Sequence, residues 1–480
     1  MPDRLTALDA AFLNSEHTGE PMHVAGLYVF DGHDERTGRR EPLDLYRLVE
    51  ARLPLVPRYR QRCLPVPFGL GHPVWIDDPD FDLSYHVRRA ALPAPGGMHE
   101  LLDYVARIHE RPLDRRRPLW ETYLIEGLAG DRIAIYTKVH HAMVDGIAGI
   151  DLATVLYDDE PDGLRLTPHT RWHPPPLRSG RRLVADVAGE AAVAGMRVGR
   201  AVLRHPAETT RRALAGLRAT TSVQRLSGML VPAPDSPFNG PVGPHRRIAL
   251  ADISLVRVKM VKNALGCTVN DVVLVIVGEA VQHYLAHRRI PHHDLSYRVM
   301  VPVSVRAESE HMQYGNRVAA MFLDLPVGPM PVKRRLTIVK DAMRRLKEEH
   351  QVVASEELIT MVSWVPATLH ALAGPLLLEH QHFINFVVSN VPGPQHPLYA
   401  GGSRLLETYP LLPVTMRIAM NICVSSYCGR LYFGLVADRD LVPDLDVLAD
   451  GISRGLDHLE RTTMPRAATT ATVGAVGGVH

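Results

Sequence analysis

Lys138-Val-His-His-Ala-Met-Val-Asp-Gly-Ile-Ala-Gly149 places two adjacent histidines and an aspartate directly after an apolar run. From Ile133 onward the apolar side chains alternate, which is the period of a β-strand. This pattern predicts a strand over 133–141 that puts His140 and His141 on opposite faces of a sheet. We therefore expect the two imidazoles to have different roles.

His141 is the better candidate for proton transfer, because it would emerge at the rim of a core or cleft. The ordinary imidazole pKa, near 6.5, suits a general base at neutral pH. A histidine on an apolar strand face can equally be a satisfied core residue, so both interpretations stay open from chemistry alone. A metal site is disfavoured, because adjacent strand residues diverge and His140, His141 and Asp145 would not converge on one ion.

The residues after the histidines predict a turn. Asp145 either holds this turn by accepting backbone N–H bonds or forms a buried ion pair. Gly146 fits a turn that leads into a helix near Ile147.

Composition excludes several classes of protein. The chain has 480 residues, of which 46% are hydrophobic and 22% charged, as expected for a globular protein with a sizeable core. A formal net charge of +2 is too balanced for a nucleic-acid-binding domain. The four cysteines show no metal-ligand or CxxC spacing and are expected to be reduced, as in the cytoplasm. The N-terminus lacks a signal-peptide pattern and no window reaches about 18 uninterrupted apolar residues, so we expect neither secretion by that route nor a membrane span.

The periodic segments divide the chain into two α/β halves, with a cleft between them as the expected binding site. The N-terminal half, 1–160, carries the histidine motif, and the C-terminal half covers 248–461. The remaining residues, 462–480, form a low-complexity tail that we expect to be disordered. Strands are predicted over 22–30, 133–141, 298–305, 319–325, 383–389 and 431–437, and helices over 43–53, 98–111, 147–157, 255–265, 271–287, 332–353 and 444–461.

The linker between the halves, 161–247, contains a basic segment. Ten arginines lie between Arg178 and Arg225, against three acidic residues. The periodicity of this segment is helical, and a basic amphipathic helix can lie on an anionic lipid surface. The alternative is a solvated crossover between two domains.

Two further short motifs supply candidate residues. Trp120, in Pro118-Leu-Trp120 (the PLW element), is most simply a large core residue that caps the sheet. Thr268-Val-Asn-Asp271 opens a helix, where Thr268 or Asn270 can be the N-cap and Asp271 sits favourably at the positive helix end. A functional Asn270 would instead offer its amide to a substrate or a neighbouring loop, which makes Asn270 and Asp271 candidate substrate contacts.

Together and in this order, these elements resemble the bacterial wax ester synthase/acyl-CoA:diacylglycerol acyltransferase family, or WS/DGAT. The HHxxxDG element alone is shared with peptide-synthetase condensation domains and resembles chloramphenicol acetyltransferase, whereas the PLW, ND and NVPGP elements narrow the likeness to WS/DGAT. The likeness spans nearly the whole chain: Leu8-Asp-Ala-Ala-Phe-Leu13, Pro21-Met-His-Val24, Pro118-Leu-Trp120, His140-His-Ala-Met-Val-Asp-Gly146, Asn270-Asp271, Asn390-Val-Pro-Gly-Pro394, Ser425-Ser-Tyr427 and Phe433-Gly434.

The resemblance implies two chloramphenicol-acetyltransferase-like α/β domains with a substrate tunnel between them. Acyl-CoA would enter one side and an alcohol the other, with no cofactor or metal. The implied reaction moves a long-chain acyl group from acyl-CoA to diacylglycerol, with wax esters from fatty alcohols as a second product. His141 would be the general base, while His140, Asp145 and Gly146 shape the motif, and Asn390 would belong to a structural loop.

Two residue roles are our own hypotheses. Asp145 is expected to pair with Arg306, at a strand end of the facing half, and so to lock the two halves together. Either the amide of Asn270 or a backbone N–H near Gly146 would supply oxyanion donors.

Two other functions are alternatives to this one. A condensation-like acyltransferase acting on another acceptor is disfavoured by the PLW and ND elements, and a non-catalytic lipid-surface protein by the intact His141 and Asp145. We expect a cytoplasmic protein, peripheral at the inner face of the plasma membrane or on lipid droplets if the basic segment binds lipid.

Overall fold

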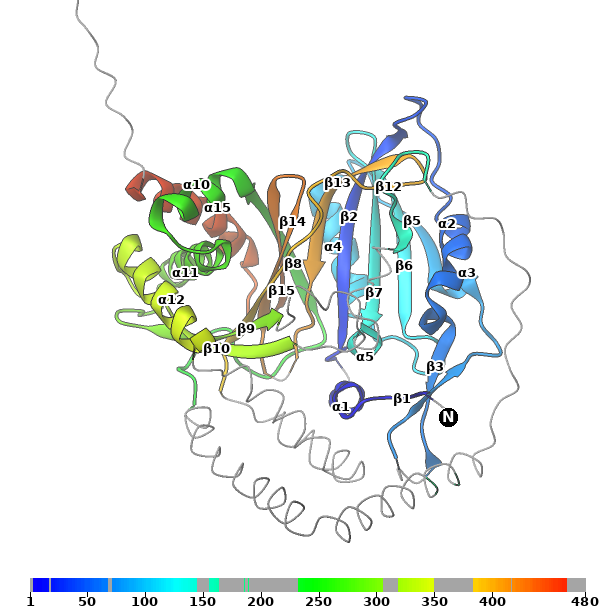
Figure 1. Ribbon diagram of the computed structural model, residues 1–480, viewed down its shortest axis with the longest axis horizontal. Coiled ribbons are helices and arrows are strands. Elements are labelled where there is room, and N and C mark those ends of the chain that lie inside the picture. The colour runs from blue at the N-terminus through cyan, green and yellow to red at the C-terminus, as the bar shows by residue number, and fades with distance from the viewer. Residues whose placement is uncertain are drawn as a thin grey trace, which may run out of the picture.

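The computed structural model describes residues 3–16, 19–67, 71–144, 155–163, 232–304, 318–348, 383–415 and 417–463, with the isolated positions 185 and 189. Two six-stranded sheets stand side by side, and a three-stranded sheet lies next to one of them (Figure 1). Helices cover the outer sides of both large sheets (Figure 1). The mixed α/β class with two sheet-rich domains, predicted from the sequence, is confirmed.

The N-terminal sheet has the strand order β12-β13-β2-β7-β6-β5. Its central strand β7 is antiparallel to both β2 and β6, and the register places His140 opposite His23 and Val139 opposite Trp120. The elements of this half are β1 (Asp3–Arg4), α1 (Ala7–Ser15), β2 (His23–Asp34), α2 (Leu45–Arg52), β3 (Gln61–Leu64), β4 (Val74–Asp77), α3 (Leu83–His86), β5 (Val87–Ala91), α4 (Met98–His109), β6 (Trp120–Leu128), β7 (Arg132–His140) and α5 (His141–Val144).

The two faces of this sheet have different neighbours. Helix α4 lies between the two large sheets and contacts β8, while α2 and α3 lie on the other side (Figure 1). Tyr136 and Lys138 of β7 point to α4. There Tyr136 makes a hydrogen bond with the ring of His109, and Lys138 donates one to the Ile108 carbonyl. The side chain of Trp120 points the other way.

The C-terminal sheet has the order β10-β9-β11-β14-β15-β8, and the described helices α10, α11, α12 and α15 lie on its outer side (Figure 1). Its central helix α11 packs against α15 so closely that a Cβ on Gly451 would lie 2.8 Å from the Cα of Ala280. The elements are β8 (Arg246–Ser254), α10 (Leu255–Leu265), α11 (Val269–His287), β9 (Ser296–Ser304), β10 (Val318–Pro326), α12 (Val332–Glu348), β11 (Phe386–Val391), β14 (Met420–Tyr427), β15 (Arg430–Asp438) and α15 (Leu445–Thr463).

One described helix, α11, is long and apolar enough to cross a membrane by length and composition. In the fold, 67% of its apolar window is buried. Its apolar side chains contact the sheet and the neighbouring helices, so the packing inside the C-terminal half accounts for its composition.

A hairpin from the later part of the chain completes the N-terminal sheet. Strands β12 (Tyr399–Ala400) and β13 (Ser403–Leu411), which follow β11 in the chain, join the N-terminal sheet, where β13 pairs with β2. The hydroxyl of Tyr427, on β14, donates to the Leu405 carbonyl at 3.0 Å. The predicted boundary at residue 247 therefore does not separate the two sheets, because a segment within 248–461 completes the N-terminal one.

Most predicted elements are confirmed within two or three residues at their starts. The strand predicted over 133–141 ends one residue early, at His140, because the backbone turns into α5 there. The structure also contains strands that the alternation pattern did not predict: the short β1, β3, β4 and β12, and the longer β5, β6, β8, β13 and β14. The basic segment, the tail and most of the predicted helix 147–157 lie outside the described residues.

Candidate active site

The end of β7 is held by backbone hydrogen bonds from both neighbouring strands. The N–H of His140 donates to the Leu119 carbonyl at 2.9 Å, and the N–H of His141 donates to the Met22 carbonyl at 2.8 Å. Leu119 belongs to the PLW element, so this element supports the histidine motif through its backbone. His141 therefore has a fixed position although it no longer belongs to the strand.

His140 is fully buried and acts as the N-cap of α5. Its Nδ1 accepts a hydrogen bond from the N–H of Ala142 at 3.1 Å, which places the ring proton on Nε2. Nε2 lies 3.8 Å from the carboxylate of Glu16. Burial, with the positive charge of Arg115 and the neighbouring His141, lowers the pKa of His140 to about 3. The imidazole of His140 is therefore neutral near pH 7.

His141 is only partly buried, and it opens α5. The ring of Phe12, from α1, lies against its imidazole with 4.1 Å between ring centroids and a tilt of 38°. One face of the imidazole is thus covered by an aromatic ring. The two histidines differ in burial, but not as opposite faces of one strand, because His141 lies beyond β7 in α5.

Buried cationic and polar groups lie beneath the motif and cap the C-terminal end of α4. The ammonium group of Lys138 donates to the carbonyls of Ile108, at 3.1 Å, and Arg111, at 2.8 Å. The Nε2–H of His23 donates to the His109 carbonyl at 2.6 Å. Positive charge at the last carbonyls of a helix complements the helix dipole.

Burial changes the pKa of each of these groups. Desolvation lowers the pKa of Lys138, while Glu121, 3.4 Å from its ammonium group, favours the charged form. Desolvation lowers the pKa of His23 well below its ordinary value. The pKa of His109 falls to about 3 through burial, with Arg246 and Lys138 adding to the shift.

Trp120 lies in the core of the N-terminal half. Its indole N–H donates to the Tyr59 carbonyl at 2.8 Å, and its ring stacks on His86 with 4.6 Å between centroids. The indole fills the sheet face opposite α4, next to the strand that carries the histidines.

The ND and NVPGP elements meet in the C-terminal half. Thr268, not Asn270, is the N-cap of α11, and the Asp271 carboxylate closes a capping box by accepting the Thr268 N–H at 2.8 Å. Asp271 is 4% exposed, so its carboxylate serves the helix end. The side-chain amide of Asn390 donates to the Oδ1 of Asn270 at 3.4 Å, which joins the two elements.

Three of the predicted site residues, Asp145, Gly146 and Arg306, lie outside the described residues. The Asp145–Arg306 ion pair stays a prediction. Over the described ranges, no group of three or more His, Cys, Asp or Glu side chains is arranged to hold a metal ion.

Sequence reasoning did not single out Glu16, Arg115 or Phe12, although all three surround the histidines. Phe12 lies in the quoted stretch 8–13, and Arg115 in an arginine run before the PLW element. Neither pattern indicates that the two segments meet, since 99 residues separate Glu16 from Arg115.

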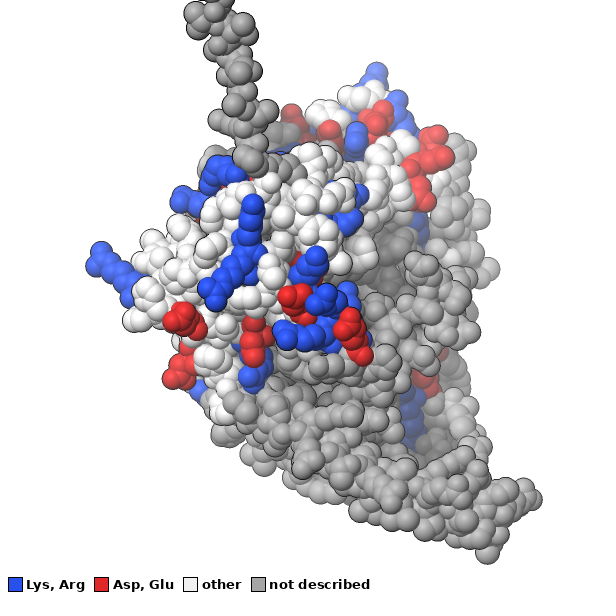
Figure 2. Space-filling model, turned by 60° about the vertical axis from the view of Figure 1, so that its left-hand side comes forward, with Lys and Arg blue, Asp and Glu red and all other residues white. Residues whose placement is uncertain are grey.

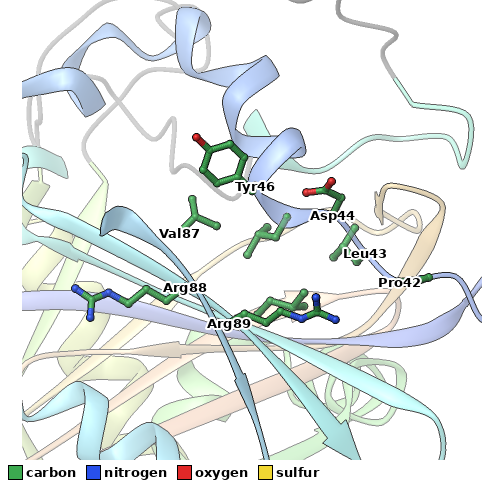
Figure 3. A pocket seen from close by; sticks show the side chains of 9 residues that line it. Pro42, Leu43, Asp44, Tyr46, Val87, Arg88 and Arg89 are labelled. Carbon is green, nitrogen blue, oxygen red and sulfur yellow. The ribbon is translucent and has the colours of Figure 1, made fainter. Parts of the chain in front are cut away.

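A pocket of about 440 Å³ lies between α2 and the edge strand β5 (Figure 3). The guanidinium groups of Arg88 and Arg89 point in opposite directions there (Figure 3), and they pair with Glu121 and Glu126. None of the motif residues lines this pocket, and its arginines are already paired. We therefore assign it no role in the site.

Comparison with known proteins identifies the family on both halves of the chain. The model for the wax ester synthase/diacylglycerol acyltransferase catalytic domain matches residues 5–273, and the model for the WS/DGAT C-terminal domain matches residues 314–460. The probable diacylglycerol O-acyltransferase tgs1 of Mycobacterium tuberculosis is 35% identical over 477 residues, which cover 97% of this chain and 98% of the relative. The probable diacylglycerol O-acyltransferase tgs2 of the same organism is 34% identical and covers 96% of this chain and 99% of the relative.

Solved structures agree on the fold. The wax ester synthase/diacylglycerol acyltransferase from Marinobacter aquaeolei VT8 aligns with a TM-score of 0.66 and 29% identity, covering 96% of this chain and 99% of that one. The first condensation domain of the calcium-dependent antibiotic synthetase aligns with a TM-score of 0.58 and 19% identity, covering 98% of each chain. The second likeness shows a shared fold only.

The buried histidines predict a pH-dependent stability. His109 and His140 are neutral in the fold and take up protons on unfolding, because their folded pKa values lie below the ordinary value of 6.5. Their contribution is complete above about pH 6.5 and falls as the pH drops, by up to about 1.4 kcal/mol per pH unit for each residue. The urea concentration at the unfolding midpoint should therefore decrease as the pH is lowered from about 7.5 to about 5.5.

A matched pair of variants tests the cause. His109→Gln should flatten the pH dependence, whereas the exposed His99→Gln, on the same helix, should leave it unchanged. An unfolding midpoint that stays constant over this range in the wild-type protein contradicts the prediction.

Proposed function

This chain belongs to the wax ester synthase/diacylglycerol acyltransferase family, and from that premise we propose that it transfers a long-chain acyl group from acyl-CoA to diacylglycerol. Acyl transfer as the class of reaction follows from the family. Two relatives named diacylglycerol O-acyltransferases support diacylglycerol as the acceptor. A relative named wax ester synthase/diacylglycerol acyltransferase supports a fatty alcohol as a second acceptor.

The proposed general base is His141. Its imidazole takes the proton from the acceptor hydroxyl as the hydroxyl oxygen attacks the thioester carbonyl. The new C–O bond forms, the C–S bond breaks, and the imidazolium returns the proton to the leaving thiolate of coenzyme A. The thioester is already activated, so transfer needs no covalent acyl-enzyme.

The observation that carries this proposal is the contrast between the two histidines. His140 is buried and neutral, and its Nδ1 accepts a hydrogen bond from the Ala142 N–H, so its role is structural. His141 is partly accessible, and its backbone is fixed by Met22. A neutral His140 puts no positive charge beside His141 when that imidazole has to accept a proton.

Asn270 is our candidate for stabilising the oxyanion. Its Oδ1 accepts from Asn390, so its Nδ2 group is directed away from Asn390 and can donate to another group. A side-chain amide donor placed where negative charge develops stabilises a tetrahedral intermediate. Asn390 then sets the orientation of the Asn270 amide.

Replacing the base tests this mechanism. His141→Ala should lower kcat by roughly 10²- to 10⁴-fold, the usual contribution of general base catalysis. Purified protein is incubated with labelled palmitoyl-CoA and a panel of diacylglycerol, monoacylglycerol and fatty alcohols. Separation of the lipid products then identifies the acceptor.

The exposed His99→Ala variant is the matched control and should transfer acyl groups like the wild-type protein. Thermal unfolding of both variants should stay cooperative. Wild-type turnover in His141→Ala would overturn the mechanism, and free coenzyme A released without any acylated lipid would overturn the proposed acceptors.

We further propose that the protein is cytoplasmic and works at the inner face of the plasma membrane or on lipid droplets. Diacylglycerol resides in lipid, and the segment between Arg178 and Arg225 carries ten arginines against three acidic residues. The surface over the C-terminal helices has a more mixed charge than the basic segment, because acidic and basic side chains both occur on it (Figure 2). The basic segment is therefore the better candidate for an anionic surface.

Vesicle binding tests this location. Arg211→Gln combined with Arg212→Gln and Arg218→Gln should weaken co-sedimentation with anionic vesicles by tenfold or more, at about 1 kcal/mol for each basic residue near the surface. The control replaces exposed arginines of α12, Arg344→Gln with Arg345→Gln, and should bind like the wild-type protein. Equal binding by all three proteins, or equal binding to uncharged vesicles, would contradict the proposal.

A further inference from the structure

Glu16 brings a buried carboxylate to the histidine motif. Its side chain is 5% exposed, and it follows directly after α1. Its Oε1 accepts the Met22 N–H at 3.2 Å, and its Oε2 lies 3.8 Å from Nε2 of His140. The carbonyl of Met22 in turn accepts the N–H of His141. Two hydrogen bonds therefore link the Glu16 carboxylate to the backbone of His141.

Arg115 compensates the buried charge of Glu16. Its Nε and Nη2 donate to Oε2 of Glu16 at 3.0 and 2.7 Å. Nη2 also donates to the Leu13 carbonyl at 2.6 Å, near the C-terminal end of α1. A carboxylate withdrawn from water is costly unless it is paired in this way. Arg115 thus joins the loop before the PLW element to the end of α1.

Helix α1 carries Phe12, whose ring covers the imidazole of His141. Helices α1 and α5 are in contact, and the Glu16–Arg115 pair anchors α1 at the residue that follows its last turn. The position of the Phe12 ring relative to the imidazole therefore depends on this anchor. Displacement of a group beside the reacting atoms by about 1 Å can lower a rate by about 10²-fold.

We propose that Glu16 and Arg115 are positioning residues: their ion pair seats α1 so that Phe12 holds the imidazole of His141 in its reactive orientation. This inference rests on the proposed function, in which His141 is the base. The effect reaches the reacting atoms through Phe12 on one side and through the Met22 backbone on the other.

Glu16→Gln keeps the size of the side chain but removes its charge. We expect kcat to fall by about 10- to 100-fold, while KM for acyl-CoA changes by less than about threefold, because orientation and not ground-state binding is lost. Arg115→Gln should have the same effect. The double variant should be no worse than either single variant, since both remove one interaction.

Arg116→Gln is the matched control, because Arg116 lies in the same loop with its side chain 87% exposed and pairs only with Asp114 among its described contacts. It should keep wild-type kcat and KM. Wild-type kcat in Glu16→Gln, additive losses in the double variant, or a loss confined to KM would each overturn the positioning role.

A second measurement needs no turnover. Diethyl pyrocarbonate modifies accessible imidazoles, and peptide mass spectrometry gives the rate at each histidine. Glu16→Gln and Phe12→Leu should each speed the modification of His141, while the buried His23 and His109 stay protected. An unchanged rate at His141, or faster modification of all three histidines together, would overturn the inference.

The two measurements separate this inference from the proposed function. If the wild-type protein transfers no acyl group to any acceptor, the proposed function fails, while selective modification of His141 still supports the anchoring of α1. If wild-type transfer is normal and Glu16→Gln transfers equally well, only the positioning inference fails.

Discussion

The pairing of β7 with strands on both sides is the constraint on which the rest of the site depends. Because β2 and β6 both hold its last residues, the backbone of His140 and His141 cannot move independently of the sheet. The helix that starts at His141 then separates the two imidazoles. One imidazole is buried and bonded to the backbone, and the other remains at the edge of the core.

Buried charge beneath the motif makes this arrangement rigid. Lys138 is withdrawn from water, yet its donors meet two carbonyls at the end of α4 and the carboxylate of Glu121. Removing one partner from such a buried set costs several kcal/mol, because an uncompensated charge is left behind. The hairpin of β12 and β13 adds a second constraint, since this later part of the chain completes the sheet that carries the histidines. The candidate base, His141, therefore follows a strand that cannot move independently of its neighbours β2 and β6.

Periodicity predicted the long helices of the described ranges and the central strands β2 and β7 of the N-terminal sheet, but not β14 at the centre of the C-terminal sheet. The motifs predicted the family, which the comparisons confirmed. The periodicity also failed to predict β5, because this strand starts with Val87 and two arginines and has no apolar alternation. The placement of β12 and β13 in the N-terminal sheet could not be predicted, because no local pattern indicates which sheet a hairpin joins. The same limit hid Glu16 and Arg115, whose pairing is a property of the tertiary fold. Asp271 was predicted at the helix start, but its carboxylate closes a capping box.

The two adjacent histidines have different roles, and the role of His140 in the fold requires a neutral imidazole. The most direct measurement is a pH titration of the histidine side-chain nitrogens by NMR between about pH 5 and pH 8, with His140 and His141 assigned from single variants. His140 should stay neutral with its proton on Nε2 throughout, because its Nδ1 accepts the hydrogen bond from the Ala142 N–H. Protonation of His140 between about pH 5 and pH 8, or a proton on its Nδ1, would show that the fold does not hold this imidazole neutral.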